Sequence, residues 1–138
     1  MATKTDALSP DLFRVIDANL NRLKEGIRVI EDIARYLQND KPLASRLKTL
    51  RHQSRIDALT DLLASRDSVN DVLRPTVESE MRRDTVESIL TANYKRAQES
   101  SRVLEEVFKI VDPALSENFK QIRYELYTLE KAHLLNSG

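Results

Sequence analysis

The chain contains an internal repeat, and two copies of one long helical pattern restrict the folds that it can adopt. Residues 18–37 read ANLNRLKEGIRVIEDIARYL, and residues 92–111 read ANYKRAQESSRVLEEVFKIV. Further along, RLKTLRH at 46–52 corresponds to NFKQIRY at 118–124. A polar residue that recurs in both copies is a better functional candidate than one seen once. The identities in the first pair of segments are Ala18/Ala92, Asn19/Asn93, Arg22/Arg96, Glu25/Glu99, Arg28/Arg102, Val29/Val103 and Glu31/Glu105.

The composition excludes several classes of protein. The 138 residues suit one domain, 1–138, with a core of its own. The 22 basic and 22 acidic residues leave no excess of positive charge for general nucleic-acid binding. There is no Cys, no apolar run long enough to cross a membrane and no signal-peptide pattern at the start. We therefore expect a cytoplasmic protein that binds neither nucleic acid nor membrane.

The spacing of apolar residues predicts an all-α fold. Helical periodicity runs from about Leu12 to Leu37, where Asn39 to Pro42 should end the helix, and again over 43–64. The segment 65–76 has the weakest periodicity and should be an irregular linker. Helix resumes near Val77 or Thr85 and continues to 111, and a last helix covers 116–134. These elements predict a helical bundle of two duplicated antiparallel helix hairpins, 13–64 and 85–134, related by a pseudo-two-fold axis.

Polar residues fall among the apolar positions of these predicted helices. A buried guanidinium needs a carboxylate or an anionic ligand, because an uncompensated buried charge is costly. One alternative is a set of ion pairs with Glu25, Glu99, Glu106, Asp57 or Glu130. For the four arginines together we favour a phosphate-binding pocket, since converging guanidinium groups suit phosphate. The two asparagines can instead bond across helices. The residues in question are Asn19, Arg22, Arg51, Asn93, Arg96 and Arg123.

Four other matched residues, Arg28, Glu31, Arg102 and Glu105, are predicted to face away from the apolar arc. Such charges usually form a solvated surface. Their recurrence in both copies favours, as an alternative, a dimer interface or the rim of a site. A homo-oligomer is therefore one of the partners that the sequence leaves open.

The linker supplies the remaining candidates. Asp67 and Asp71 lie four residues apart beside Arg66. One or two carboxylates are how proteins commonly hold Mg²⁺. Turn formation by Asp and Ser is the alternative explanation, and the bare spacing favours it.

The sequence resembles the all-helical domain that is often fused ahead of thiamin phosphate synthase. The strings that carry the resemblance are RVIDANLNRLKEGIRVIEDIARY, LKTLRH, SRDSVNDV, ANYKRAQESSRVLEEVFK and IRYELYTLEK, and together they cover about residues 13–132. That family is regarded as an alternative hydroxymethylpyrimidine phosphate kinase. Its pattern has Gly after the Asp-Val of the linker, where this chain has Leu73-Arg74-Pro75.

The resemblance implies an ATP-dependent kinase that converts the pyrimidine phosphate to the diphosphate. Asp67 and Asp71 would then be catalytic and bind Mg²⁺. The phosphates of substrate and nucleotide would lie against the six inward residues and Arg66. The alternative is a non-catalytic helical module that docks on, or regulates, thiamin phosphate synthase.

Overall fold

The described part of the chain is entirely helical apart from turns and caps. The structure is a computed structural model that describes residues 9–56 and 85–136, and these ranges contain no strand. The all-α prediction is confirmed. The elements are α1 (Pro10–Asp32), the π-helical η2 (Ile33–Leu37), α2 (Lys41–Gln53), α5 (Val86–Val111) and α6 (Pro113–Asn136).

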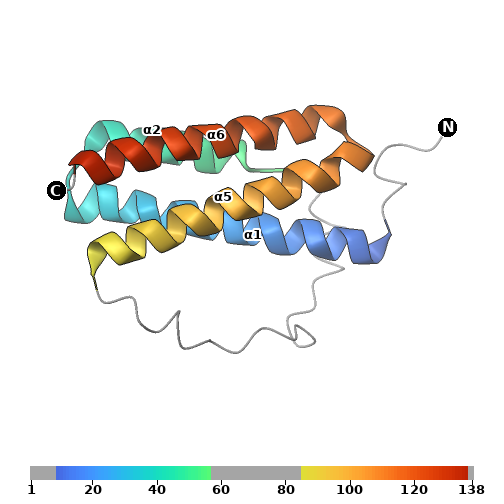
Figure 1. The fold of residues 1–138 in the computed structure, drawn as a ribbon, viewed down its shortest axis with the longest axis horizontal. Coiled ribbons are helices and arrows are strands. Elements are labelled where there is room, and N and C mark those ends of the chain that lie inside the picture. Colours follow the sequence, from blue (N-terminus) through green and yellow to red (C-terminus); the bar gives the residue numbers. More distant parts are fainter. Residues whose placement is uncertain (1–8, 57–84, 137–138) are drawn as a thin grey trace.

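The four α-helices of the described ranges pack as a bundle, in which α1 runs antiparallel to α2 and α5 runs antiparallel to α6 (Figure 1). Helix α1 contacts both α2 and α5, α5 contacts α6, and α2 closes the bundle through fewer contacts with α6. The predicted relation of the two halves by a pseudo-two-fold axis stays a prediction.

Local sequence explains where the helices begin. Ser9 accepts a hydrogen bond from the Leu12 N–H ahead of Pro10, and Asp40 accepts one from the Leu43 N–H. Thr85 forms a reciprocal capping box at the start of α5. Each cap satisfies a backbone donor that has no partner within the helix.

Two predicted helix boundaries were wrong. The second helix ends at Gln53, and residues 54–56 are not helical, although the prediction ran to 64. The Ser54 hydroxyl donates to the Leu50 carbonyl, which offers the last turn a side-chain alternative to continued helix. The last helix begins at Pro113 rather than 116, because proline is well accommodated in a first turn. The linker 65–76 lies outside the described residues.

Aliphatic side chains from all four helices form one core. Tyr94 and Phe119 are the largest fully buried side chains. The Nδ1 atom of His133 lies 2.8 Å from the Tyr94 hydroxyl, and its Nε2 atom lies 2.6 Å from Gln38 Oε1. Burial lowers the pKa of His133, which favours the neutral ring in this network. The fully buried aliphatic residues include Leu23, Ile27, Ile30, Leu47, Leu90, Leu104, Leu126 and Leu129.

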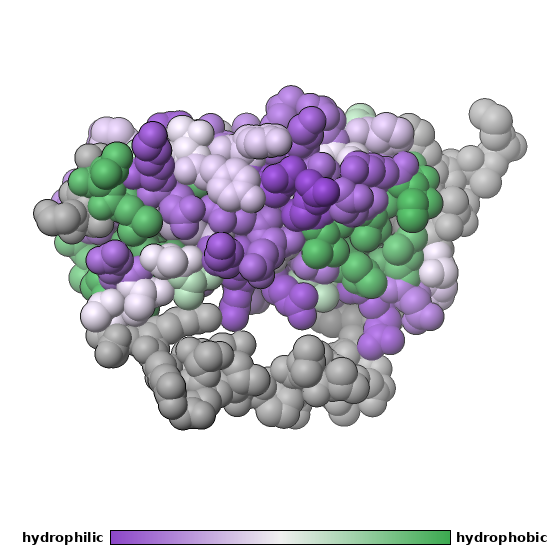
Figure 2. Space-filling model, viewed as in Figure 1, coloured by the Kyte–Doolittle hydropathy of each residue, from purple (hydrophilic) through white to green (hydrophobic). Residues whose placement is uncertain are grey.

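The surface is mixed. On the face shown in Figure 2, hydrophobic residues gather towards the two ends of the bundle and hydrophilic residues lie between them. In the described ranges, no helix has both the length and the hydropathy of a membrane span.

Candidate functional site

The two matched asparagines lie at equivalent places and make the same hydrogen bond. Asn19 Nδ2 donates to the Val15 carbonyl at 2.9 Å, and Asn93 Nδ2 donates to the Ile89 carbonyl at 2.8 Å. Both side chains are buried, as the helical wheel predicted. Each amide is therefore held by its own helix, at the surface where α1 contacts α5.

Two of the four inward arginines are held by carboxylates. Arg51 lies 2.7 Å from Glu31 through Nε, and Arg123 lies 2.9 Å from Glu105 through Nη2. The hydrogen bond to Glu31 raises the pKa of Arg51. Because Glu31 and Glu105 match in the repeat, and Arg51 and Arg123 match as well, the fold builds one ion pair twice.

The carboxylates of these pairs were misplaced by sequence reasoning. Glu31 and Glu105 were expected to face away from the core, yet they are only 3% and 5% exposed. The ion-pair alternative had also named other acidic residues as partners. Their recurrence in both copies could have indicated that they are buried. We gave more weight to the apolar spacing, which placed them on the outer side of the helix. Whether Arg51 and Arg123 also contact a phosphate stays a prediction.

The other two arginines do not point into the core. Arg22 is exposed, contrary to the prediction, and Arg96 is half-buried. Among the described residues, neither one forms an ion pair within 4.0 Å. Glu25 and Glu99, the matched carboxylates three residues further on, are exposed as well. The predicted phosphate-binding pocket of the four arginines stays a prediction.

Arg22 and Arg96 belong to two stripes that repeat every seven residues. Because seven residues are close to two helical turns, such residues lie on one side of a helix. The stripes border the row that joins the two helices, where Gly26 packs on Asn93 and Ala97. We call these stripes together the α1/α5 face: Val15, Arg22, Val29 and Tyr36 on α1, and Ile89, Arg96, Val103 and Ile110 on α5.

The α1/α5 face leaves large apolar side chains in solvent. Val29 is 36% exposed and its repeat partner Val103 is 37% exposed. Tyr36 and Ile110, which also match, are 64% and 75% exposed. The face therefore has a charged centre and apolar ends, and the duplication reproduces that order on both helices.

The linker candidates cannot be placed. Arg66, Asp67 and Asp71 all lie outside the described residues. Their predicted roles, and the expected binding of ATP and Mg²⁺, stay predictions. Within the described ranges, no three His, Asp or Glu side chains cluster as metal ligands do.

Comparison with known proteins identifies relatives over nearly the whole chain. A family model described as the ThiD2 family matches residues 14–132. A thiamine-phosphate synthase of Synechocystis sp. is 42% identical over 122 residues, which are 88% of this chain and 36% of that protein. The thiamine-phosphate synthase of Thermosynechococcus vestitus is 40% identical over 126 residues, 91% of this chain and 36% of the relative. No solved structure matches.

These relatives correct one expectation. The chain was expected to be an ATP-dependent hydroxymethylpyrimidine phosphate kinase. That prediction was wrong, because relatives about 40% identical over about 90% of the chain are named for a synthase and not for a kinase. The chain spans about a third of the length of the curated relatives that it matches.

Proposed function

The chain belongs to the ThiD2 family, and on that premise we propose that it acts in thiamin biosynthesis as a non-catalytic helical module that docks on thiamine-phosphate synthase. The names of the relatives support the pathway. Their length supports the docking role, because in each of them a segment like this chain shares one polypeptide with about twice as much other sequence. The rest of the synthase is thus the occupant that we expect on its surface.

The observation that carries this proposal is the exposed α1/α5 face. Large apolar side chains that stay in solvent on one face commonly mark an interaction surface. Here Val29 and Tyr36 on one helix are matched by Val103 and Ile110 on the neighbouring helix. Heptad spacing on both helices suits a partner helix that lies along the face.

The charged centre of the face adds to the same proposal. Arg22 and Arg96 are not ion-paired within the described residues, so their guanidinium groups are available to a partner. Exposed Glu25 and Glu99 lie one turn away on the same helices. Complementary charges at the middle of an interface fix its orientation and select the partner.

A binding titration tests the docking role. The full chain is mixed with purified thiamine-phosphate synthase, and the complex is measured by isothermal titration calorimetry and size-exclusion chromatography. The variants Val103→Glu and Ile110→Glu each place a carboxylate in an apolar contact. Each should weaken binding by at least about tenfold.

The matched control is Leu135→Glu on α6, where an aliphatic side chain is 73% exposed but lies outside the α1/α5 face. That variant should bind as the unmodified chain does. Absence of any complex with the unmodified chain would refute the docking role, and equal weakening by the control would refute the choice of surface.

A further inference from the structure

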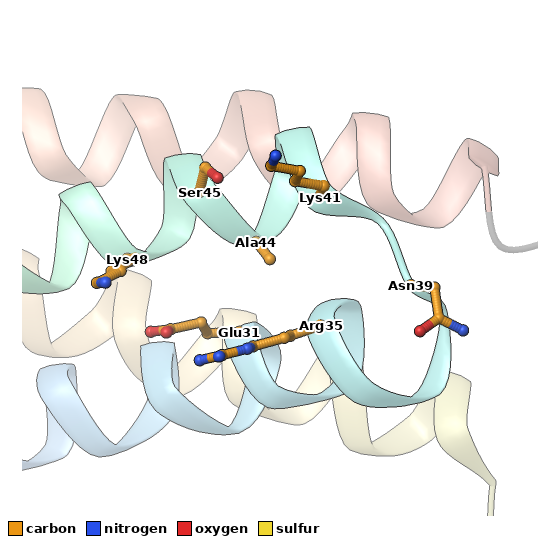
Figure 3. A pocket seen from close by; sticks show the side chains of 7 residues that line it. All are labelled: Glu31, Arg35, Asn39, Lys41, Ala44, Ser45 and Lys48. Atoms are coloured by element: carbon orange, nitrogen blue, oxygen red, sulfur yellow. The ribbon is translucent and has the colours of Figure 1, made fainter.

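A pocket at one end of the bundle, apart from the α1/α5 face, has not been assigned any role. It has a volume of ≈ 340 Å³ and lies between the end of the first long helix and α2. Figure 3 shows the Arg35 side chain extending from η2 beside Glu31, with Lys48, Ser45 and Lys41 along α2 above them. This volume lies in the usual range for small-molecule sites.

The backbone at this pocket is irregular and firmly held. Residues 33–37 form a π-helical segment, and π-bulges are frequent at functional sites. Asn39 follows with a φ of 52°, and the Asp40 N–H donates to the Ala34 carbonyl at 2.8 Å. The neighbouring Gln38 is anchored to His133. The turn that lines the pocket is therefore fixed before any ligand arrives.

The charge lining the pocket is positive. Within the described residues, Arg35, Lys41 and Lys48 form no ion pair within 4.0 Å. The carboxylate in the pocket, Glu31, is already paired with Arg51. The sequence around it is one-sided, since residues 41–56 contain five Lys or Arg and no Asp or Glu.

The nearby carboxylates do not neutralise the positive charge of the pocket, and the pKa of the histidine on α2 reflects that charge. Asp32 is paired with Arg28, and Asp40 is engaged by the Leu43 N–H. Burial, and then the charges of Arg55, Arg51 and Lys48, lower the pKa of His52 on the same helix.

The second repeat copy keeps two of these cations, as Lys109 and Lys120, but differs at the other positions. By the alignment of the two copies, Arg35 corresponds to Lys109, which is paired with Glu106. Lys41 corresponds to Pro113, and Ser45 corresponds to Glu117. The duplicated core does not require these residues of the first copy. This combination of unpaired cations and a hydroxyl therefore occurs in the first copy and not at the matched positions of the second.

We propose that this pocket binds a small phosphate-bearing anion. Three cations, the Ser45 hydroxyl and the Asn39 amide surround one concave space, and guanidinium and ammonium groups together suit a divalent oxyanion better than a single carboxylate. The proposal goes beyond docking, because it concerns a different surface and a different class of ligand.

An NMR titration tests the site. Inorganic phosphate and then pyrophosphate are added to ¹⁵N-labelled full chain at constant ionic strength, with chloride as the reference anion. Saturable shifts are expected around η2, Asn39 and the first half of α2. Arg35→Gln and Lys48→Gln should each weaken binding about tenfold, as loss of one charge-assisted hydrogen bond predicts.

The repeat supplies matched controls. Lys109→Gln and Lys120→Gln remove the corresponding cations of the second copy and should leave phosphate binding unchanged. Thermal melts of all four variants check the fold. Shifts that do not saturate, or controls that weaken binding as much as Lys48→Gln does, would overturn the proposal. It would also be overturned if phosphate did not bind while Lys48→Gln weakened the complex with the synthase, since the pocket would then belong to the docking surface.

Discussion

At the scale of single residues, the helical wheel succeeded where neighbouring helices cover the apolar arc and failed at its edges. Asn19 and Asn93 are buried as predicted. Arg22 was misplaced because apolar spacing shows which residues share a side of a helix but not whether another helix covers that side, and the apolar Val15, seven residues earlier, is also exposed. Glu31 was misplaced for the opposite reason: α2 packs against α1, and Arg51 on α2 supplies the charge that makes the burial of Glu31 tolerable.

The buried ion pair between α5 and α6 should be important for stability. Glu105→Gln removes the charge that compensates Arg123 and leaves a buried guanidinium unpaired. Removing one partner of a buried pair typically costs about 3–5 kcal/mol in the free energy of unfolding. Urea denaturation followed by circular dichroism measures the loss.

Glu106→Gln is the matched control for this variant. Glu106 is the next residue on α5, and its pairs with Lys109 and Arg102 are exposed. The loss should therefore be much smaller than that of Glu105→Gln, because exposed ion pairs contribute little to stability. Equal losses for the two variants would contradict the role assigned to the buried pair.

At the scale of elements, the sequence placed the helix starts only approximately. Ser9, Asp40 and Thr85 cap the observed starts by acting locally on the backbone, whereas the start of the last helix at Pro113 was predicted at 116. The π-helical turn of η2 could not be predicted in this way. It depends on how the end of the first helix meets α2 and on the hydrogen bond between Gln38 and His133, which joins residues 95 positions apart. The pocket beside it was missed for the same reason.

The crossing of α1 and α5 should depend on the single glycine within a helix. A Cβ atom at Gly26 would lie 3.1 Å from the Asn93 carbonyl oxygen and 3.5 Å from the Ala97 Cβ. The close neighbour is helix backbone, which cannot rotate away. Gly26→Ala should therefore reduce the free energy of unfolding by about 1 kcal/mol, with overpacking outweighing the better helix propensity of alanine.

Chemical denaturation measures this change, and Ser100→Ala is the control. Ser100 holds the matched position in α5 and already carries a Cβ atom, so the variant loses only the hydrogen bond to the Arg96 carbonyl. Its effect should be within about 1 kcal/mol. An increase in stability for Gly26→Ala would show that the two helices can separate at no cost.

At the scale of the whole molecule, the spacing of apolar residues predicted the all-α class, but the repeat did not show how the two halves depend on each other. The net charge of zero was equally uninformative, because it averages a helix α2 without carboxylates against more acidic segments elsewhere. The contact of α1 with α5 joins the two halves, and the core on both sides of it is continuous. One half alone would expose the surface that the other half covers.

Two fragments should therefore fold only together. A chain divided between Asn70 and Asp71 gives one fragment with α1 and α2 and another with α5 and α6. Each alone should have much less than its share of the helical circular dichroism signal, because isolated helical hairpins without tertiary packing are marginal in water. An equimolar mixture should regain most of the signal of the intact chain.

Leu104→Asp in the second fragment should prevent this recovery, since Leu104 is fully buried, whereas Thr128→Asp at an exposed position of the same fragment should not. If the first fragment had its full helical signal alone, the hairpins would be independent units, and the prediction of one domain over 1–138 would fail.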